Sequence, residues 1–118
     1  MVSVRGFVDT SLTFAEFSKL EMRVGKIVEI DDIPQARNPM YKLKIDFGPL
    51  GVKQCVGGVK SHYTRTQLLG RQVVVVVNLQ PKSVAGVTSE CMMLAAFDEK
   101  DIALLKPDRE MPLGTRVA

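Results

Sequence analysis

The sequence predicts an all-β fold, and two stretches carry most of that prediction. Residues 73–77 are five consecutive valines. β-Branched side chains favour a strand, because they pack well on a pleated surface and lose rotamer freedom in a helix. An unbroken apolar run of this kind indicates burial on both faces. Residues 41–47 instead alternate apolar with charged side chains, which is typical of a strand with one apolar face.

The elements before residue 41 are a short helix, a strand and a loop. Thr13 and Glu16 have the spacing of a capping box, which predicts a helix over residues 14–19. Phe14, Phe17 and Leu20 follow at helical spacing, so we expect this apolar side to fill part of the core. A strand is expected over residues 22–30, with Gly25 marking a bend or a close backbone approach. Prolines make residues 32–40 a loop.

The elements after residue 47 are mostly strands. Residues 48–51 predict a hairpin turn and residues 52–56 the returning strand. Residues 61–69 include one helical turn that Gly70 closes, and the valine strand follows it. A polar connection over residues 78–88 leads to a strand over 90–97 and a shorter strand over 102–105. Prolines and a glycine predict a looped tail after residue 106.

The order of these elements predicts the five-stranded OB barrel. A short helix lies between the third and fourth long strands, as it does in that fold, which is a common platform for nucleic acids. A β-sandwich is disfavoured because too few strands are available. With 118 residues, the chain has the length of one domain, and we expect residues 1–118 to form a single domain with its barrel core at about 20–105. The apolar stretch over residues 2–8 is expected to pack against a second subunit or across a barrel end.

Charge is unevenly distributed along the chain. Residues 35–82 contain eight basic side chains and one acidic one, whereas the remaining segments contain more acidic than basic residues. A basic middle of this kind indicates a localised anionic partner, with nucleic acid as the leading candidate. A solvated charged face is the alternative interpretation.

Catalytic and metal-binding patterns are absent from the sequence. The one histidine, His62, has no nucleophile at a recognisable spacing, and no phosphate-binding glycine motif, HExxH or CxxC occurs. We therefore expect no enzyme activity, no metal and no cofactor. Cys55 and Cys91 are expected to be buried reduced thiols, with a disulfide as the alternative. No apolar run is long enough to cross a bilayer and no signal peptide is recognisable, so a cytoplasmic protein without a membrane partner is expected.

Four segments together resemble the stand-alone tRNA-binding domain family. They are MRVGKIV at 22–28, NPMYKLKID at 38–46, GRQVVVVVNLQPK at 70–82 and SECM at 89–92. That family includes the C-terminal domain of many methionyl-tRNA synthetases and the bacterial protein CsaA. The segment at 38–43 is closer to CsaA-like proteins, and the segment at 56–64 is closer to the synthetase type. Cys91 stands where the family usually has glycine, and a side chain at this position is expected to narrow the cleft that the glycine opens near the segment at 89–92.

The resemblance implies an OB-fold homodimer that binds tRNA by shape at the outer corner of the L. Dimerisation in the family uses terminal extensions outside the barrel strands. The implied role is non-catalytic and auxiliary to aminoacylation or tRNA chaperoning, with a synthetase as a further partner. The alternative role is that of a CsaA-like chaperone that binds unfolded export substrates.

Residues of the basic middle are the candidates for contacts with RNA. Lysines are expected to neutralise phosphates, Asn78 and Ser89 to hydrogen-bond sugars or base edges, and Met92 to contact a base. The five lysines are Lys42, Lys44, Lys53, Lys60 and Lys82. Alternatively, Asn78 ends the valine strand and Met92 belongs to the core. With no tryptophan and few other aromatic residues, the chain lacks the stacking platform of general single-strand binders.

Overall fold

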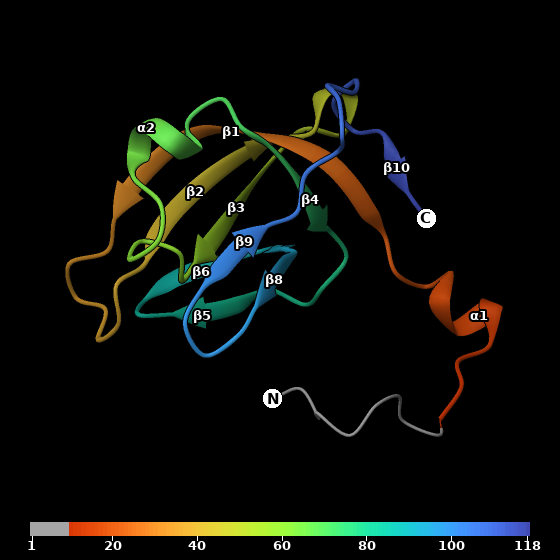
Figure 1. The fold of residues 1–118 in the computed structure, drawn as a ribbon, viewed down its shortest axis with the longest axis horizontal. Helices are drawn as coiled ribbons and strands as arrows, with labels where there is room; N and C mark the ends of the chain where they lie inside the picture. The colour runs from red at the N-terminus through yellow and green to blue at the C-terminus, as the bar shows by residue number, and fades with distance from the viewer. Residues whose placement is uncertain (1–9) are drawn as a thin grey trace.

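The computed structural model describes residues 10–118, in which an antiparallel five-strand sheet curls into a nearly closed barrel (Figure 1). The strand order is β3-β2-β1-β4-β7, and β10 pairs with β1 outside this path. β5 pairs with β6 and β8 with β9 in two further ribbons. The strands are β1 (Met22–Asp32), β2 (Tyr41–Asp46), β3 (Val52–Gly57), β4 (Gln72–Val76), β5 (Lys82–Val84), β6 (Val87–Ser89), β7 (Met92–Met93), β8 (Ala95–Phe97), β9 (Ile102–Leu104) and β10 (Arg116–Val117). The helices are α1 (Phe14–Phe17), α2 (Arg65–Leu68) and the 3-10 turn η1 (Gly48–Leu50).

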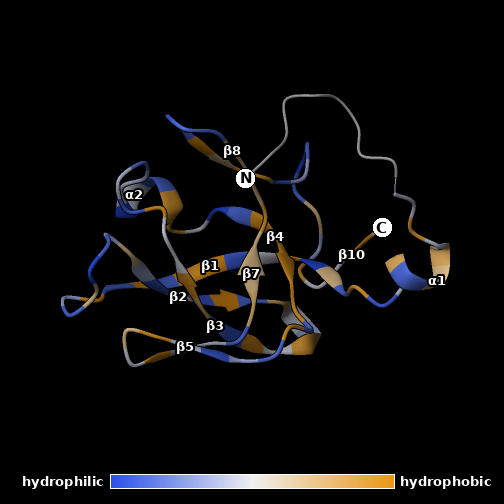
Figure 2. Ribbon diagram, turned by 90° about the horizontal axis from the view of Figure 1, so that it is seen from below, coloured by the Kyte–Doolittle hydropathy of each residue, from blue (hydrophilic) through white to orange (hydrophobic). Residues whose placement is uncertain are grey.

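The barrel is filled by the side chains that the two strand patterns predicted. Tyr41, Leu43 and Ile45 of β2 are buried, while the lysines between them are not. All four valines of β4 are buried, so the prediction of burial on both faces is confirmed; Figure 2 shows the hydrophobic colour running along this strand. Gly25 allows the close approach that was expected, since a Cβ there would lie 2.5 Å from Ile45 Cγ2.

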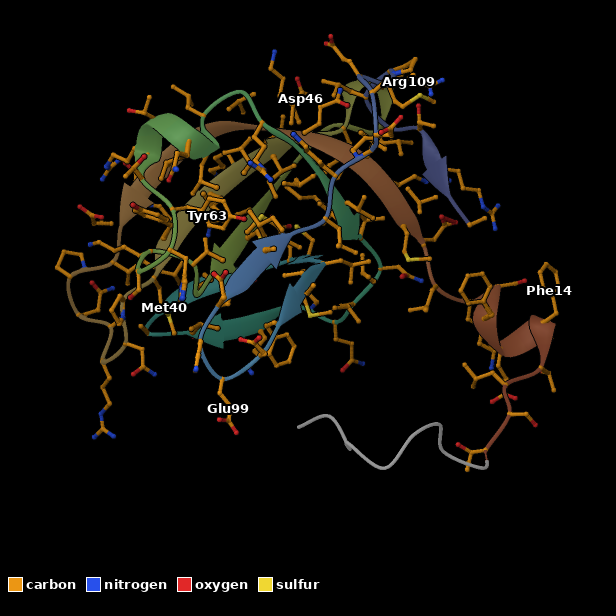
Figure 3. The ribbon with its side chains drawn as sticks, in the orientation of Figure 1. Phe14, Met40, Asp46, Tyr63, Glu99 and Arg109 are labelled. Carbon is orange, nitrogen blue, oxygen red and sulfur yellow. The ribbon has the colours of Figure 1, made fainter. Side chains whose placement is uncertain are left out.

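The first helix does not fill the core, and this prediction was wrong. The capping box between Thr13 and Glu16 is present, but α1 is a single turn without a buried residue. Phe14 is 82% exposed and lies outside the barrel (Figure 3). The barrel interior is already occupied by side chains such as Phe47, Leu43 and Ile45, which leaves no space for the helix. The stretch expected to pack on a second subunit, residues 2–8, lies outside the described residues.

The sequence indicated a looped C-terminal tail, but the tail contains one short strand, β10. Met22 and Arg23 of β1 pair with β4 on one side, and β2 begins to pair only from Lys26 onward. This leaves the second edge of β1 open at its start. β10 pairs there, with Met22 opposite Val117. The tail forms a strand here because the open edge of β1 offers unpaired backbone groups, although the tail carries no strong strand signal of its own.

The segment after β4 contains more structure than the sequence predicted. The polar connection forms the β5–β6 hairpin, in which Val84 and Val87 pair across a two-residue turn. Ala85 and Gly86 both have positive φ, 51° and 81°, which suits a tight hairpin turn. Ala-Gly is a weaker signal for such a turn than Asn-Gly, so the pattern was missed. The expected strand over 90–97 is divided into β7 and β8.

No helix within residues 10–118 combines the length and the hydropathy needed to cross a bilayer.

Candidate nucleic-acid interface

The barrel closes at the free edge of β3 through two side chains and one backbone hydrogen bond. The backbone N–H of Gln54 donates to Glu90 Oε1 at 2.9 Å, and the backbone N–H of Glu90 donates to the backbone carbonyl of Gln54 at 2.8 Å. The Val56 N–H donates to Ser89 Oγ at 3.0 Å. Ser89 and Glu90 thus stand in for a neighbouring strand and satisfy backbone groups that would otherwise be unpaired. We call this line of contacts the seam.

The β5–β6 hairpin is fixed beside the seam by two amide side chains. Gln54 Nε2 donates to the Thr88 carbonyl at 2.8 Å, which holds the hairpin against β3. Gln35 Nε2 donates to the Ala85 carbonyl at 2.9 Å, which joins the tip of the hairpin to the loop before β2. In OB folds the face of the second and third strands, with the two loops flanking it, is the usual ligand surface. The hairpin therefore borders that surface.

Lys82 presents an exposed ammonium on this hairpin. It lies at the start of β5, and its cross-strand partner is the neutral Ser89. Among residues 10–118 no carboxylate lies within ion-pair distance of Lys82. Its charge is therefore available to an anionic partner.

Lys42 and Lys44 lie side by side on the outer face of β2, but each has an acidic neighbour. The register places Lys42 opposite Asp31 and Lys44 opposite Glu29 on β1. Directly opposite residues in an antiparallel pair share a face and interact when their charges are opposite. The positive charge that the linear sequence concentrates here is partly compensated by β1.

Lys60 is held by a carboxylate. Its Nζ lies 2.8 Å from Asp32 Oδ1, and Arg65 Nη2 lies 3.0 Å from Asp32 Oδ2. The hydrogen bonds from Lys60 and Arg65 hold the pKa of the Asp32 carboxyl below its ordinary value. Both cations also lie within 6 Å of the ring centroid of Tyr41, at 5.8 and 5.9 Å. This cluster borders an open polar cavity of about 540 Å³.

Lys53 lies apart from the other predicted lysines. Its partner across β2–β3 is Ile45, whose side chain is in the core. Lys53 is therefore on the opposite sheet face from Lys44, whose partner is Gln54. The five lysines named from the sequence do not form one continuous patch.

Asn78 and Ser89 use their polar atoms within the fold. Asn78 Oδ1 accepts from the Glu21 N–H at 3.0 Å, and its Nδ2 donates to the Lys19 carbonyl at 2.6 Å. These bonds tie the end of β4 to the chain between α1 and β1, which agrees with the strand-ending interpretation. Ser89, already an acceptor at the seam, also donates to the Cys91 carbonyl at 3.2 Å.

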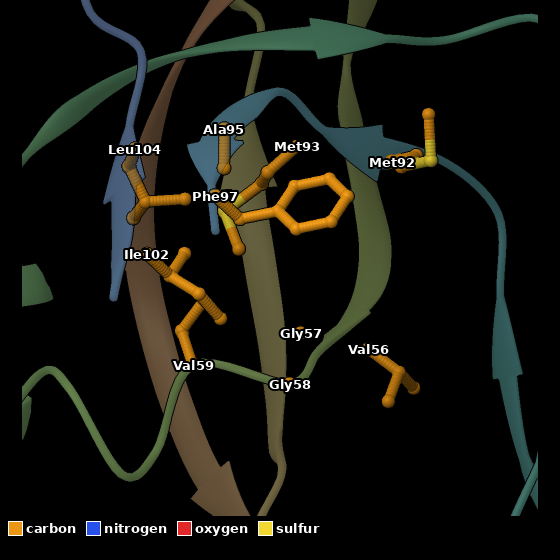
Figure 4. A pocket seen from close by; sticks show the side chains of 10 residues that line it. All are labelled: Val56, Gly57, Gly58, Val59, Met92, Met93, Ala95, Phe97, Ile102 and Leu104. Atoms are coloured by element: carbon orange, nitrogen blue, oxygen red, sulfur yellow. The ribbon is translucent and has the colours of Figure 1, made fainter. Parts of the chain in front are cut away.

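Met92 is 49% exposed and therefore does not belong to the core. It lines an apolar cavity of about 190 Å³ between the end of β3 and the β7–β8–β9 segment (Figure 4). The ten lining residues are Val56, Gly57, Gly58, Val59, Met92, Met93, Ala95, Phe97, Ile102 and Leu104. Phe97 and Gly58 were not singled out by the sequence analysis. A lone aromatic residue that ends an apolar run was the available signal for Phe97.

The two cysteines are buried free thiols, as expected. Cys55 Sγ lies 3.2 Å from the Cys91 carbonyl oxygen. A hydrogen bond with the Cys55 thiol and burial raise the pKa of the Cys91 thiol, so it stays protonated near neutral pH. Cys91 packs in the core and is not part of the apolar cavity wall. The residue that replaces the family glycine therefore does not narrow this cavity.

Among residues 10–118, the one hydrogen-bond contact of the His62 ring is to a backbone carbonyl and not to a catalytic side chain. Its Nε2 lies 3.4 Å from the Lys100 carbonyl oxygen, at an exposed position on the rim of the polar cavity. Within residues 10–118 no three His, Cys, Asp or Glu side chains gather as metal ligands do.

A comparison with protein families matches residues 22–116 to the family described as "Putative tRNA binding domain". Curated relatives include the methionine–tRNA ligases of Thermococcus kodakarensis, 47% identical over 106 residues, and Pyrococcus furiosus, 46% identical over 106 residues. Each alignment covers 90% of this chain but only 14% of the ligase. The chain thus spans about one seventh of the length of these relatives.

Solved structures with the same fold match over nearly their whole length. The chaperone CsaA from Bacillus anthracis superposes with a TM-score of 0.87 at 38% identity, covering 92% of this chain and 100% of that one. A protein from Pyrococcus horikoshii described as related to methionyl-tRNA synthetase gives a TM-score of 0.83 at 31% identity, with coverage of 92% and 99%.

Proposed function

The chain belongs to the tRNA-binding domain family, and from that premise we propose that it binds folded tRNA, as a homodimer, in a non-catalytic role. That role is auxiliary to aminoacylation or to tRNA chaperoning in the cytoplasm, with an aminoacyl-tRNA synthetase as a further partner. The observation that carries the proposal is Lys82, which is exposed, has no ion-pair partner among residues 10–118, and lies on a hairpin fixed beside the usual OB ligand face.

The proposed RNA surface consists of the hairpin and the adjoining outer face of β2 and β3. Lys82 supplies a phosphate contact, and Lys42 and Lys44 add weaker ones because acidic side chains face them. Lys60 and Lys53 approach the backbone of a bent RNA only at the margins of this surface. Met92 contacts a base. Asn78 and Ser89 act by holding the segment in place, since their polar atoms bind the backbone.

Dimer formation is proposed to involve the terminal extensions. Leu12 and Phe14 are exposed on and before α1, outside the barrel, and apolar side chains of this size in one short segment are typical of an interface. Light scattering on the full chain and on the Phe14→Ser variant tests this. A dimer for the full chain and a weakened one for the variant are expected, whereas a monomeric full chain would contradict dimerisation.

A gel shift with a tRNA transcript at moderate salt tests the RNA surface. Lys82→Ala should weaken binding severalfold and lower the salt dependence of affinity by about 0.7–0.9 in log–log slope, because one phosphate contact is lost. Lys26→Ala is the matched control, since this exposed lysine lies opposite Asp46 on β2. Equal affinity of Lys82→Ala and the unaltered chain would rule out the assigned surface.

A second candidate function is that of a chaperone for unfolded polypeptides. It is favoured by the full-length match to the structure described as chaperone CsaA and by the apolar cavity beside Met92. Binding of a reduced, carboxymethylated protein, measured with and without excess tRNA, tests it. Polypeptide binding that tRNA leaves unchanged would indicate a second, separate surface, and no polypeptide binding would remove this candidate.

A further inference from the structure

The apolar cavity at the end of β3 has the dimensions of a site for one flat ring. Its volume is about 190 Å³, and cavities of about 150 Å³ hold one benzene molecule. One wall is the backbone of Gly57 and Gly58, which presents no side chains. Another is the ring of Phe97, which lies among the lining side chains in Figure 4.

Phe97 is exposed to solvent at this cavity. It is 64% exposed and lines the cavity, whereas Phe14, which is also exposed, does not. Met92 and Met93 place polarisable thioethers on the same cavity. Aromatic faces and thioethers are both favourable surroundings for another aromatic ring.

The rim of the cavity also offers hydrogen bonds. Gly58 follows β3 and is exposed, and within residues 10–118 neither its N–H nor its carbonyl has a hydrogen-bond partner. A purely apolar guest would leave these groups unmatched, whereas the edge of a nucleobase carries donors and acceptors.

We propose that this cavity receives a single unstacked nucleobase of the bound RNA, stacked against Phe97. The inference rests on the proposed tRNA-binding function and extends it, because it places the base that Met92 contacts in this cavity and gives it Phe97 as a stacking partner. Folded RNAs expose a few such bases in their loops, and these are the groups that aromatic side chains recognise.

The test uses the full chain, a tRNA transcript and three variants. Phe97→Ala removes the stacking face, and Phe97→Trp restores one. Gly58→Leu adds bulk at the rim, where a Cβ would meet no atom within 4 Å, so the fold has room for it. Melting temperatures of all variants establish that they are folded.

Phe97→Ala is expected to weaken tRNA affinity at least about fivefold, since loss of one stacked base has an effect of that size or larger. Gly58→Leu should weaken it similarly, and Phe97→Trp should restore it. The salt dependence of affinity should not change in any of the three, because no phosphate contact is removed. Methyl NMR should also show ring-current shifts of Met92 and Met93 when tRNA is added.

The result that overturns the inference is unchanged tRNA affinity in both Phe97→Ala and Gly58→Leu, with tRNA binding by the unaltered chain intact. If those variants lose binding to a reduced, carboxymethylated protein and keep tRNA binding, the cavity is a polypeptide site and the inference is equally overturned. Failure of the unaltered chain to bind tRNA is a different outcome, because it contradicts the proposed function itself.

Discussion

The β1–β2–β3 meander and the segment over residues 78–97 meet at the seam but are built in different ways. In the meander, backbone ladders pair the strands, and the charges of β2 face opposite charges on β1. In the second segment, the strands are two or three residues long, and Ser89 and Glu90 make with their side chains the bonds that a ladder would make. The comparison separates a region of paired strands and paired charges from one in which Lys82, Met92 and Phe97 are exposed, and we propose that the second region contacts the partner.

The largest expected effect on the free energy of unfolding comes from a substitution in the meander. Leu43 is fully buried in β2, so Leu43→Ala should lower the free energy of unfolding by about 2–5 kcal/mol through lost transfer energy and a cavity. Denaturant unfolding measures it. Met92→Ala is the control from the second segment, and its half-exposed side chain should cost far less. Equal losses in both variants would contradict the division of roles.

A smaller effect is expected at the seam itself. Glu90→Ala leaves the Gln54 N–H without its acceptor, and loss of a charge-assisted hydrogen bond should lower the free energy of unfolding by about 1–2 kcal/mol. Glu90→Gln keeps an oxygen acceptor and should lose less. Glu99→Ala, in an exposed loop, is the matched control and should unfold like the unaltered chain. If Glu90→Ala also did so, the seam would not depend on this side chain.

The smallest effect concerns pH. Because Lys60 and Arg65 lower the pKa of Asp32 in the folded state, the contribution of this carboxylate to stability is present above its unfolded-state pKa and is lost as the pH falls through the folded-state value. Asp32→Asn should therefore be slightly less stable at neutral pH and indistinguishable from the unaltered chain in strong acid. Unfolding curves at several pH values check this, and a difference that grew toward acid would contradict the sign.

The two regions also differ in how far the sequence predicted them. Strict alternation in β2 and the valine run of β4 leave one arrangement that buries the apolar side chains, so strands, faces and core followed from local pattern. The β5–β6 hairpin and the closure of the seam did not, because they depend on long-range bonds such as Gln35 to Ala85 and Gln54 to Thr88. Nothing in a linear pattern shows which distant backbone group an amide side chain will meet.

Prediction of the candidate site from the sequence was limited in the same way. Lys82 was predicted as an exposed cation and is one. The excess of basic residues over 35–82 overestimated the net positive charge of the sheet face. Glu29, Asp31 and Asp32 of β1 lie outside these residues in the sequence but beside their cations in space. The roles of Asn78 and Ser89 were likewise unpredictable, since their partners are backbone groups of other elements.

The most direct test of the central claim is amide hydrogen exchange of the full chain with and without saturating tRNA. The account predicts that tRNA slows exchange in residues 82–97, including the β5–β6 hairpin and β8, and leaves residues 22–32 of β1 nearly unchanged. Protection centred on β1, with the hairpin exchanging as it does in the free protein, would contradict the claim that the segment beyond the seam presents the RNA-binding surface.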